Sequence, residues 1–305
     1  MRPEWQERVR ALAADHVSSS SALALRAGEL LDEVAREDPA CLAALAQNIV
    51  RAQPAMAAVA NVANVALRAV ETLGAAAVGA ALQVLVAAVD ADRKAASEAL
   101  CQRLDAPVGV VTTSASASVV EALQALRRRD LLRGVVCGES RPLLEGTALS
   151  RWLADHGYEV TLVTDAALAE HLVAGTVFLA GTDAILPEHV VNKRGTRLYA
   201  AWARLAGVER YVLSTRDKLY PPDLVPCFAN PERPAEEILR NPPPALHVDN
   251  RPFDLTPREA WTEILVGAHP AIEAEARGDR ALSPGLRPLL EPGAAKPVAW
   301  RAGLA

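Results

Sequence analysis

The chain has few cysteines, and none of them stands at a spacing that predicts a disulfide framework or a zinc site. The 305 residues include only four, Cys41, Cys101, Cys137 and Cys227, which are far apart in the chain. The six histidines show no metal-ligand spacing either. We therefore expect no metal and no other cofactor, and we interpret most of the cysteines as small buried hydrophobic side chains.

The chain also lacks an excess of positive charge, since its formal net charge is −5. A protein that holds nucleic acid by neutralising phosphates needs a basic surface, so we expect no direct nucleic-acid partner. The first residues carry charges where a secretion signal needs an apolar core, and the apolar stretch at 74–89 is too short to span a membrane comfortably. These features predict a cytoplasmic protein with no membrane partner.

The pattern of apolar residues changes once along the chain. Over residues 1–105, Ala and Leu recur at helical spacing with Arg and Glu on the opposing faces, which predicts a helical N-terminal domain. Over 106–276, short apolar runs alternate with amphipathic segments, which predicts an α/β domain built on a parallel sheet. Residues 277–305 show little periodicity, and we expect a weakly ordered or partner-dependent tail.

Within the α/β region, the two periodicities predict individual elements. The expected strands lie at 107–112, 134–138, 158–163, 176–180, 210–214 and 245–248, and the expected helices at 116–128, 145–156, 165–172, 195–206 and 256–266. The proline-rich segment 219–245 should cross the surface before the last strand.

Polar side chains follow the expected strand at 176–180. Asp183 comes soon after this strand, and Asn192 and Lys193 precede a Gly-Thr pair that should open a helix. Ligands of open α/β sheets bind beyond the carboxyl ends of the strands, and a helix start suits an anion. We therefore predict a small anionic ligand here, with Asp183 as the catalytic candidate. The alternative for Asn192 and Lys193 is to cap the helix.

Two further loops should lie at the same edge of the sheet. The loop after the first strand is rich in hydroxyl groups, which suit phosphate through O–H and backbone N–H donors; the candidate ligand contacts are Thr113, Ser114, Ser116 and Ser118. The alternative is that these serines only cap the following helix. Arg141 follows the second strand, where it either contacts the ligand or pairs with a carboxylate such as Glu139.

Four motifs occur in an order found in one superfamily. They are Thr112-Thr-Ser-Ala-Ser-Ala-Ser-Val-Val-Glu-Ala-Leu123, Glu139-Ser-Arg-Pro-Leu-Leu-Glu-Gly146, Gly181-Thr-Asp183 with Asn192-Lys-Arg-Gly-Thr196, and Pro252-Phe-Asp-Leu-Thr-Pro257. Over about residues 15 to 268 the chain resembles the regulatory alpha, beta and delta subunits of translation initiation factor 2B and their relatives methylthioribose-1-phosphate isomerase and ribose-1,5-bisphosphate isomerase. The resemblance implies a Rossmann-like C-terminal domain, a phosphorylated sugar bound between the two domains, and a homodimer.

The chain departs from the isomerases at three positions that the resemblance assigns to the site. Ser114 stands where the isomerases carry a cysteine that moves protons together with the aspartate matching Asp183, and an unactivated serine hydroxyl is a poor acid or base. Gln53 replaces a phosphate-binding arginine, and Glu145 replaces a glutamine. Lys218 matches a family lysine in an altered segment, with a solvated loop lysine as the alternative.

Three functions stay open from the sequence. The first is an aldose–ketose isomerase of a sugar phosphate that uses Asp183 with a changed partner, with Ser114 or, less simply, His189 in the second role. The second is a non-catalytic sensor or regulatory subunit that binds a sugar phosphate or a nucleotide. The third is a structural subunit of a larger assembly.

Overall fold

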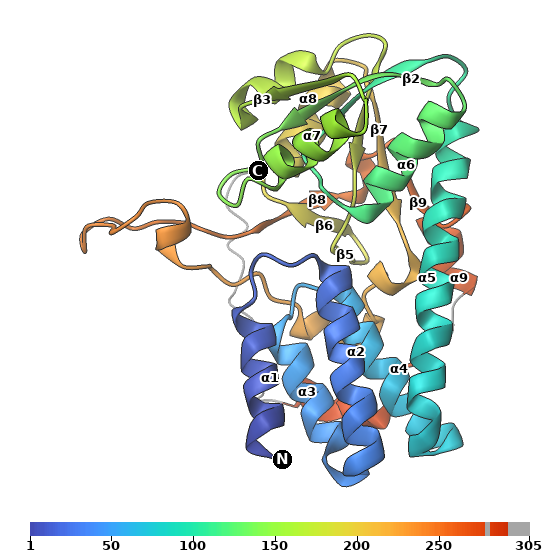
Figure 1. The fold of residues 1–305 in the computed structure, drawn as a ribbon, viewed down its shortest axis with the longest axis vertical. Coiled ribbons are helices and arrows are strands. Elements are labelled where there is room, and N and C mark those ends of the chain that lie inside the picture. Colours follow the sequence, from blue (N-terminus) through green and yellow to red (C-terminus); the bar gives the residue numbers. More distant parts are fainter. Residues whose placement is uncertain (278–280, 292–305) are drawn as a thin grey trace. The chain divides into compact units, whose positions relative to one another are not determined.

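The computed structural model describes residues 1–277 and 281–291, which form two compact units (Figure 1). The first unit contains Met1–Ala87, Asp217–Glu232 and residues 281–291, and the second contains Ala88–Arg216 and residues 233–277. Each unit is therefore assembled from segments that are distant in the sequence. Most of the tail that we expected to be weakly ordered, residues 278–280 and 292–305, lies outside the described residues.

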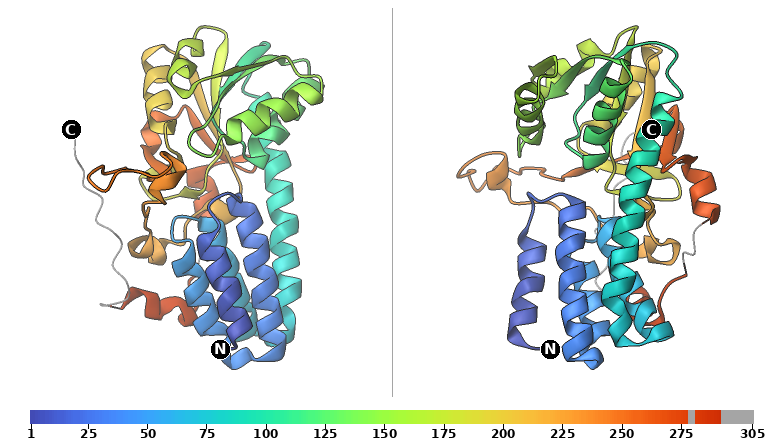
Figure 2. Two further views of the ribbon diagram at one scale, coloured as in Figure 1. Left: turned by 60° about the vertical axis from the view of Figure 1, so that its left-hand side comes forward. Right: turned by 45° about the vertical axis from the view of Figure 1, so that its right-hand side comes forward.

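The first unit is a bundle of α-helices, as the spacing of Ala and Leu predicts. Its helices are α1 (Pro3–Ala14), α2 (Ser20–Glu37), α3 (Leu42–Ala52), α4 (Ala57–Leu73) and the first part of α5 (Val78–Cys101), with short 3-10 turns η1 (Pro39–Cys41) and η2 (Ala75–Ala77) between them. Figure 2 shows α1 to α4 side by side. Fully buried leucine and isoleucine side chains such as Leu23, Leu31, Leu45 and Ile49 fill the bundle.

The later segments of the first unit are short 3-10 helices, namely η5 (Pro222–Cys227) and η8 (Pro284–Leu290). η8 falls within the predicted tail, but Leu286 is completely buried and Gln47 Nε2 of α3 donates to the Gly285 carbonyl oxygen at 2.8 Å. The described residues of the tail are therefore packed, whereas we expected weak order there.

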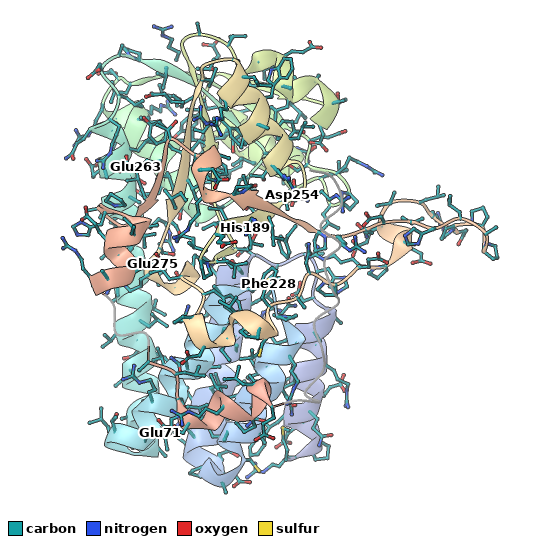
Figure 3. The ribbon with its side chains drawn as sticks, turned by 180° about the vertical axis from the view of Figure 1, so that it is seen from behind. Glu71, His189, Phe228, Asp254, Glu263 and Glu275 are labelled. Atoms are coloured by element: carbon teal, nitrogen blue, oxygen red, sulfur yellow. The ribbon has the colours of Figure 1, made fainter. Side chains whose placement is uncertain are left out.

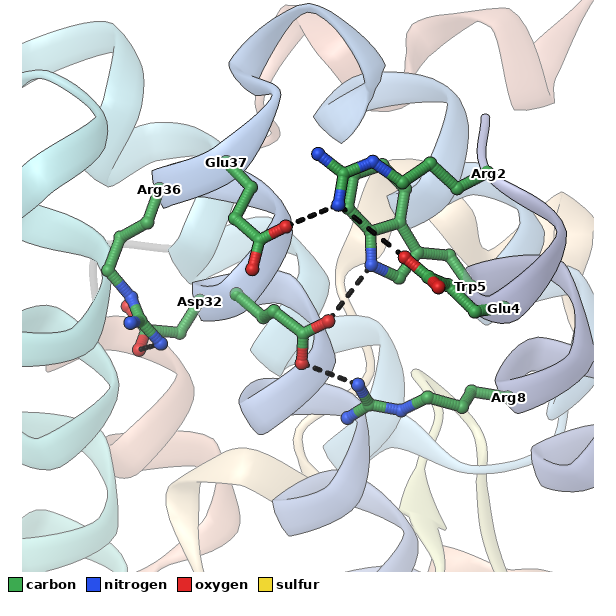
Figure 4. A network of polar contacts seen from close by, with 8 residues as sticks. Arg2, Glu4, Trp5, Arg8, Asp32, Arg36 and Glu37 are labelled. Atoms are coloured by element: carbon green, nitrogen blue, oxygen red, sulfur yellow. Dashed lines mark hydrogen bonds and ion pairs between the residues drawn. The ribbon is translucent and has the colours of Figure 1, made fainter.

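A polar network joins α1 to α2 (Figure 4). Trp5 Nε1 donates to Glu33 Oε1 at 2.9 Å, and Arg8 Nη1 donates to Glu33 Oε2 at 2.5 Å. These bonds, from Arg8 first and then Trp5, lower the pKa of Glu33. The network fixes the first helix of the chain against the second.

The second unit is built on a seven-stranded sheet with the order β10-β9-β7-β4-β1-β2-β3. Its strands are β1 (Val108–Thr112), β2 (Leu132–Gly138), β3 (Val160–Val163), β4 (Thr176–Ala180), β7 (Glu209–Ser214), β9 (Glu263–Val266) and β10 (His269–Pro270). All pairings are parallel except that of β10. The helices α6 (Ala117–Arg128), α7 (Glu145–Asp155) and α8 (Thr196–Leu205) connect the strands, so the predicted α/β fold class is confirmed.

Three predicted elements of this unit are wrong. Residues 165–172 form a 3-10 helix, η3 (Asp165–His171), instead of an α-helix. Residues 245–248 form no strand, because three prolines precede them and no neighbouring strand pairs with them. The predicted helix at 256–266 is instead the end of β8 (Phe253–Pro257), the 3-10 turn η7 (Arg258–Ala260) and strand β9. Periodicity alone does not separate a buried strand as short as β9 from a helix.

A second, antiparallel sheet of three strands was not predicted. It has the order β5-β6-β8, in which β5 is Ala184–Ile185 and β6 is His189–Lys193. The sheet carries the residues that follow β4, including the Asn192-Lys193 pair, and joins them to β8 from the C-terminal part of the unit.

Helix α5 is apolar, and its first part is little buried, whereas Ala96, Ala99 and Leu100 near its end are in the hydrophobic core. Together with η2 it forms a helix, Ala75–Cys101, that by length and composition alone is long and apolar enough to cross a membrane. Of its most apolar stretch, 11% is buried in the structure. Val84 on this helix is 70% exposed. A single helix of this kind is weak support for a membrane span, because helices of many other proteins pass the same test.

Candidate functional site

The candidate site lies at one edge of the seven-stranded sheet. Strands β4, β1 and β2 are neighbours and run parallel, so the loops that follow them begin at the same edge. These loops carry most of the residues that the sequence singled out. The site described here belongs entirely to the second unit.

The hydroxyl-rich loop after β1 contacts the loop after β4. Ser114 Oγ accepts a hydrogen bond from the Gly181 backbone N–H at 3.3 Å, and the Ser114 N–H donates to Thr112 Oγ1 at 3.1 Å. A Cβ atom on Gly181 would overlap the Ser116 hydroxyl and lie 3.1 Å from Ser114 Oγ. Glycine at this position therefore allows the two loops to meet, which brings Ser114 near the segment of Asp183.

The other hydroxyl groups of this loop have different surroundings. Thr113 is buried, and its Oγ1 lies 3.0 Å from Ser140 Oγ in the loop after β2. Ser116 Oγ accepts from the Val119 N–H at 3.2 Å and caps α6, which is the alternative role that the sequence left open. Ser118 lies half-buried in the first turn of α6.

The loop after β2 has an unusual backbone. Ser140 and Leu144 adopt positive φ angles of 62° and 59°, which are uncommon for residues other than glycine. The Asp165 carboxylate holds this loop, because Oδ1 accepts from the Ser140 N–H at 2.8 Å and Oδ2 from the Arg141 N–H at 2.7 Å. Gly146 lies so close to this loop that a Cβ atom there would overlap the Gly138 carbonyl oxygen.

The Arg141 side chain is exposed and bonded to another part of the same unit. Its Nη2 donates to the Ile238 carbonyl oxygen at 3.1 Å. The guanidinium group thus anchors the segment that contains Ile238, and no pairing with Glu139 occurs among the described contacts.

Asp183 and Asn192 both lie at the small sheet. The Asp183 N–H donates to the Val191 carbonyl oxygen at 2.8 Å, and Ala184 of β5 pairs with Val191 of β6. Asn192 is buried, and its Nδ2 donates to Thr196 Oγ1 at 3.2 Å. The backbone of Asp183 is therefore bonded to the residue that precedes Asn192.

Lys193 forms an ion pair with Glu145, the first residue of α7. The side chain of Lys193 is only 13% exposed. The second carboxylate oxygen of Glu145, Oε2, is buried and has no hydrogen-bond partner among the described residues. Glu145, which stands where the isomerases have a glutamine, therefore opposes the charge of Lys193.

The start of α8 is occupied by a carboxylate of the chain itself. Asp254 Oδ2 accepts from the Gly195 N–H at 2.8 Å and from the Arg197 N–H at 3.1 Å (Figure 3). We predicted that the Gly-Thr pair at this helix start holds a ligand anion; the side chain of Asp254 takes that place instead. Thr256, the first residue of the helix expected at 256–266, lies within β8.

Two residues of the first unit that the resemblance singled out have structural contacts. Gln53 Nε2 donates to the carbonyl oxygens of Leu12 at 2.7 Å and Asp15 at 3.2 Å, so it ties down the end of α1. Lys218 is buried, and its Nζ donates to Ser20 Oγ at 2.5 Å. Lys218 is therefore not the solvated loop lysine that was the alternative.

Two other titratable groups near the sheet edge stay protonated at neutral pH. Burial raises the pKa of the Cys137 thiol at the end of β2, more than the hydrogen bond with Ser150 lowers it. Burial also raises the pKa of Tyr199 to about 12, and its hydroxyl donates to the Asp165 carbonyl oxygen at 2.7 Å. Within residues 1–277 and 281–291, no three His, Cys, Asp or Glu side chains gather as a metal site requires.

Sequence reasoning missed Ser140 and Asp165. Ser140 was read only as part of a motif, and its hydroxyl bonds the hydroxyl-rich loop. Asp165 follows strand β3 directly after Thr164, and an acid just beyond a strand end was the available signal.

Comparison with known proteins agrees with this architecture. The profile described as "Initiation factor 2 subunit family" matches residues 16–267. A protein of Pyrococcus horikoshii named "Putative translation initiation factor eIF-2B subunit 2-like" is 28% identical over 225 residues, which cover 70% of this chain and 79% of that protein. A methylthioribose-1-phosphate isomerase of Heliobacterium modesticaldum is 33% identical over 170 residues, 52% of this chain and 48% of that enzyme.

The match to a second archaeal relative is also partial. The eIF-2B subunit 2-like protein of Pyrococcus furiosus is 33% identical over 120 residues, and the chain spans 44% of its length. The chain thus spans less than half of several of the curated relatives that it matches.

Solved structures share the fold. The translation initiation factor eIF-2B of Pyrococcus horikoshii superposes with a TM-score of 0.77, covering 91% of this chain and 100% of that chain at 23% identity. The 5-methylthioribose 1-phosphate isomerase of the same organism gives a TM-score of 0.66, covering 86% of this chain and 83% of that chain at 21% identity. Because the profile covers most of the chain, this chain belongs to the Initiation factor 2 subunit family.

Proposed function

We propose that the chain binds a phosphorylated sugar at the carboxyl ends of β1, β2 and β4. The observation that carries the proposal is the state of the hydroxyl groups in the loop after β1. Ser114 Oγ and Ser116 Oγ each accept a backbone N–H bond, so each hydroxyl keeps its own proton to donate. Hydroxyl protons that converge beside a helix start suit the oxygens of a phosphate group.

We further propose that the bound sugar phosphate undergoes aldose–ketose isomerisation, with Asp183 as the base. The family includes sugar-phosphate isomerases. Moving a hydrogen between neighbouring carbons of a sugar requires a base that removes a proton and an acid that returns one. Asp183 is a carboxylate in the loop after β4, and Ser114 Oγ accepts the N–H of Gly181 in the same loop.

A second candidate function is a non-catalytic sensor of a sugar phosphate or a nucleotide. The observation that favours it is Ser114 itself, because a serine hydroxyl has a pKa far above neutral and the described partner of its Oγ is the Gly181 backbone N–H. A site in which a serine hydroxyl stands in place of a thiol suits binding better than proton transfer.

A ligand screen tests the shared part of both candidates. We expect a thermal shift of the purified full chain with pentose phosphates, because a ligand at one hundred times its Kd adds about 2.7 kcal/mol to the stability of the folded state. The panel includes methylthioribose 1-phosphate, nucleoside monophosphates and inorganic phosphate. A screen in which no phosphorylated compound shifts the unfolding temperature would refute the binding proposal.

Two substitutions then separate the enzyme from the sensor. If the chain is an isomerase, Asp183→Asn abolishes ketose formation from the bound sugar phosphate, whereas Asp155→Asn on the exposed end of α7 leaves the rate unchanged. If the chain is a sensor, the wild type is inactive and Ser114→Cys creates activity, because a thiol has a pKa near neutral. Sugar-phosphate binding that neither substitution alters would contradict the placement of the ligand beside these residues.

We also propose that the chain forms a homodimer and acts in the cytoplasm, as the resemblance implies. One structure of a related fold is named a tetrameric beta2-delta2 complex of Chaetomium thermophilum eIF2B. Light scattering of the purified chain tests the dimer, and a mass of one chain at micromolar concentration would reject it.

A further inference from the structure

The second unit carries a proline-rich arm, residues 233–250, which is the orange segment that projects from it in Figure 1. The two ends of the arm meet, because the Arg233 N–H donates to the Asn250 carbonyl oxygen at 2.9 Å. Asn250 is buried, and its Nδ2 donates to the Pro234 carbonyl oxygen and to Glu237 Oε2, each at 2.8 Å. A buried amide therefore fixes the base of the arm.

The outer part of the arm presents apolar side chains to solvent. Ile238, Leu239 and Leu246 are 39%, 42% and 49% exposed. Residues 242–244 are three consecutive prolines, which stiffen the backbone between these side chains. A stiff segment loses little conformational freedom when it docks, and exposed apolar side chains gain free energy when a partner covers them. The arm is therefore suited to bind another surface.

Helix α8 presents a second apolar surface on the same unit. Leu198, Trp202 and Leu205 share one face of the helix, and they are 65%, 50% and 83% exposed. The base of the arm lies beside the start of this helix, because the Arg194 guanidinium group bonds the Asp249 carboxylate at 3.1 and 3.2 Å. The arm nevertheless leaves the α8 face of its own copy uncovered.

The charges of α8 indicate what covers its face. Helix α8 contains no acidic residue, and its exposed Arg197 and Arg204 have no ion-pair partner among the described residues. The arm carries the exposed Glu236 as well as Arg240, and neither side chain has a partner in the described part of the chain. A partner of α8 must bring apolar side chains together with a carboxylate, and the arm offers both.

We infer that the arm of one copy packs on the α8 face of a second copy, whose own arm packs on the first copy in return. A two-fold axis makes such a surface self-complementary. A stable interface takes about 20–30 residues from each partner, and residues 233–249 with the ten residues of α8 provide that many. The inference rests on the homodimer of the proposed function and names the surface that forms it.

Light scattering of the full chain over a range of concentrations tests the inference. We expect the wild type to form dimers and Leu198→Glu to raise the dissociation constant of the dimer by about thirtyfold or more, because the substitution puts a charge in an apolar contact. Replacing residues 235–248 with a short glycine-serine linker, which keeps the base of the arm, should have the same effect. Circular dichroism checks that both variants fold.

The matched control is Ile272→Glu on helix α9 (Ala271–Arg277), because Ile272 is 73% exposed and belongs to the same unit. This change should leave the dissociation constant as it is. A wild-type dimer that survives either the Leu198→Glu change or the shortening of the arm overturns the inference, while the proposed homodimer stands. A wild type with the mass of one chain at micromolar concentration overturns both and leaves the surface to a different partner. The proposed sugar-phosphate site is judged separately, by the thermal shift.

Discussion

Replacing Asp165 with asparagine should loosen the loop that follows β2. The carboxylate accepts two backbone N–H bonds, from Ser140 at 2.8 Å and from Arg141 at 2.7 Å, and Ser140 has a positive φ of 62°. A hydrogen bond to a charged acceptor contributes about 1.5–3 kcal/mol, and the bond from the exposed Arg141 N–H contributes less than that from Ser140. Asparagine keeps the size of the side chain but turns one acceptor into a donor that faces an N–H group. We therefore expect a loss of about 2–3 kcal/mol in the free energy of unfolding.

Urea denaturation of the full chain at pH 7 measures this loss, and Asp155→Asn on α7 is the matched control. The control residue is exposed, and substitutions at such positions usually change stability by less than about 0.5 kcal/mol. Asp165→Asn should also weaken the binding of ribose 5-phosphate, because Ser140 bonds Thr113 of the proposed phosphate site. A stability change no larger than that of the control would refute the view that Asp165 holds the loop.

Three further substitutions test the packing and the electrostatics of the chain. Gly146→Ala should destabilise the protein by about 3 kcal/mol in urea denaturation, because its methyl group would overlap a backbone carbonyl oxygen. Gly28→Ala inside α2 should stabilise the protein by about 0.5–1 kcal/mol, because its methyl group has room, with neighbours at 3.5 Å, and alanine favours a helix more than glycine does. Equal effects of the two changes would contradict this reasoning. Burial raises the pKa of Asp15, but hydrogen bonds from the Ser18 N–H and from Arg26 lower it further, so the folded pKa lies below the unfolded value of about 3.9. Asp15 therefore contributes stability above pH 4 that is lost as the pH falls through the folded pKa, and Asp15→Asn should cost about 1–2 kcal/mol at pH 7 and less at pH 3. A cost that stays constant between these two pH values would reject the assignment.

The α/β fold was predictable because five short apolar runs, which form β1, β2, β3, β4 and β7, alternate with amphipathic segments. The last part of the second unit was not predictable from the sequence, and strand β9 (Glu263–Val266) shows why. Its three apolar residues are buried where β9 pairs with β7, and a run of this length is equally typical of one turn of a buried helix. The choice between the two is made by the neighbouring strand, which is far away in the sequence.

The candidate site was predictable to the level of loops, but not of individual contacts. Parallel strands bring their carboxyl ends to one edge, so the positions of Ser114 and Asp183 near one another follow from the order of the strands. The contacts of Lys193 and of the start of α8 do not follow from the order of the strands. Glu145 lies 48 residues before Lys193 in the sequence. Asp254 reaches α8 only through the pairing of β6 with β8. Sequence spacing contains no signal for either contact.

These two contacts share a consequence for the chemistry of the site. Both places where a ligand anion was expected, beside Lys193 and at the start of α8, are occupied by carboxylates of the chain, Glu145 and Asp254. Each carboxylate satisfies a cation or N–H groups that a phosphate would otherwise need, so neither place offers net attraction to an anion. Among the sequence-predicted positions of the second unit, the hydroxyl groups of Ser114 and Ser116 accept backbone N–H bonds and have no carboxylate among their described contacts. Each hydroxyl therefore keeps a proton that a phosphate oxygen can accept. Under the proposed function, the phosphate binds at this serine loop rather than beside Lys193 or at the start of α8.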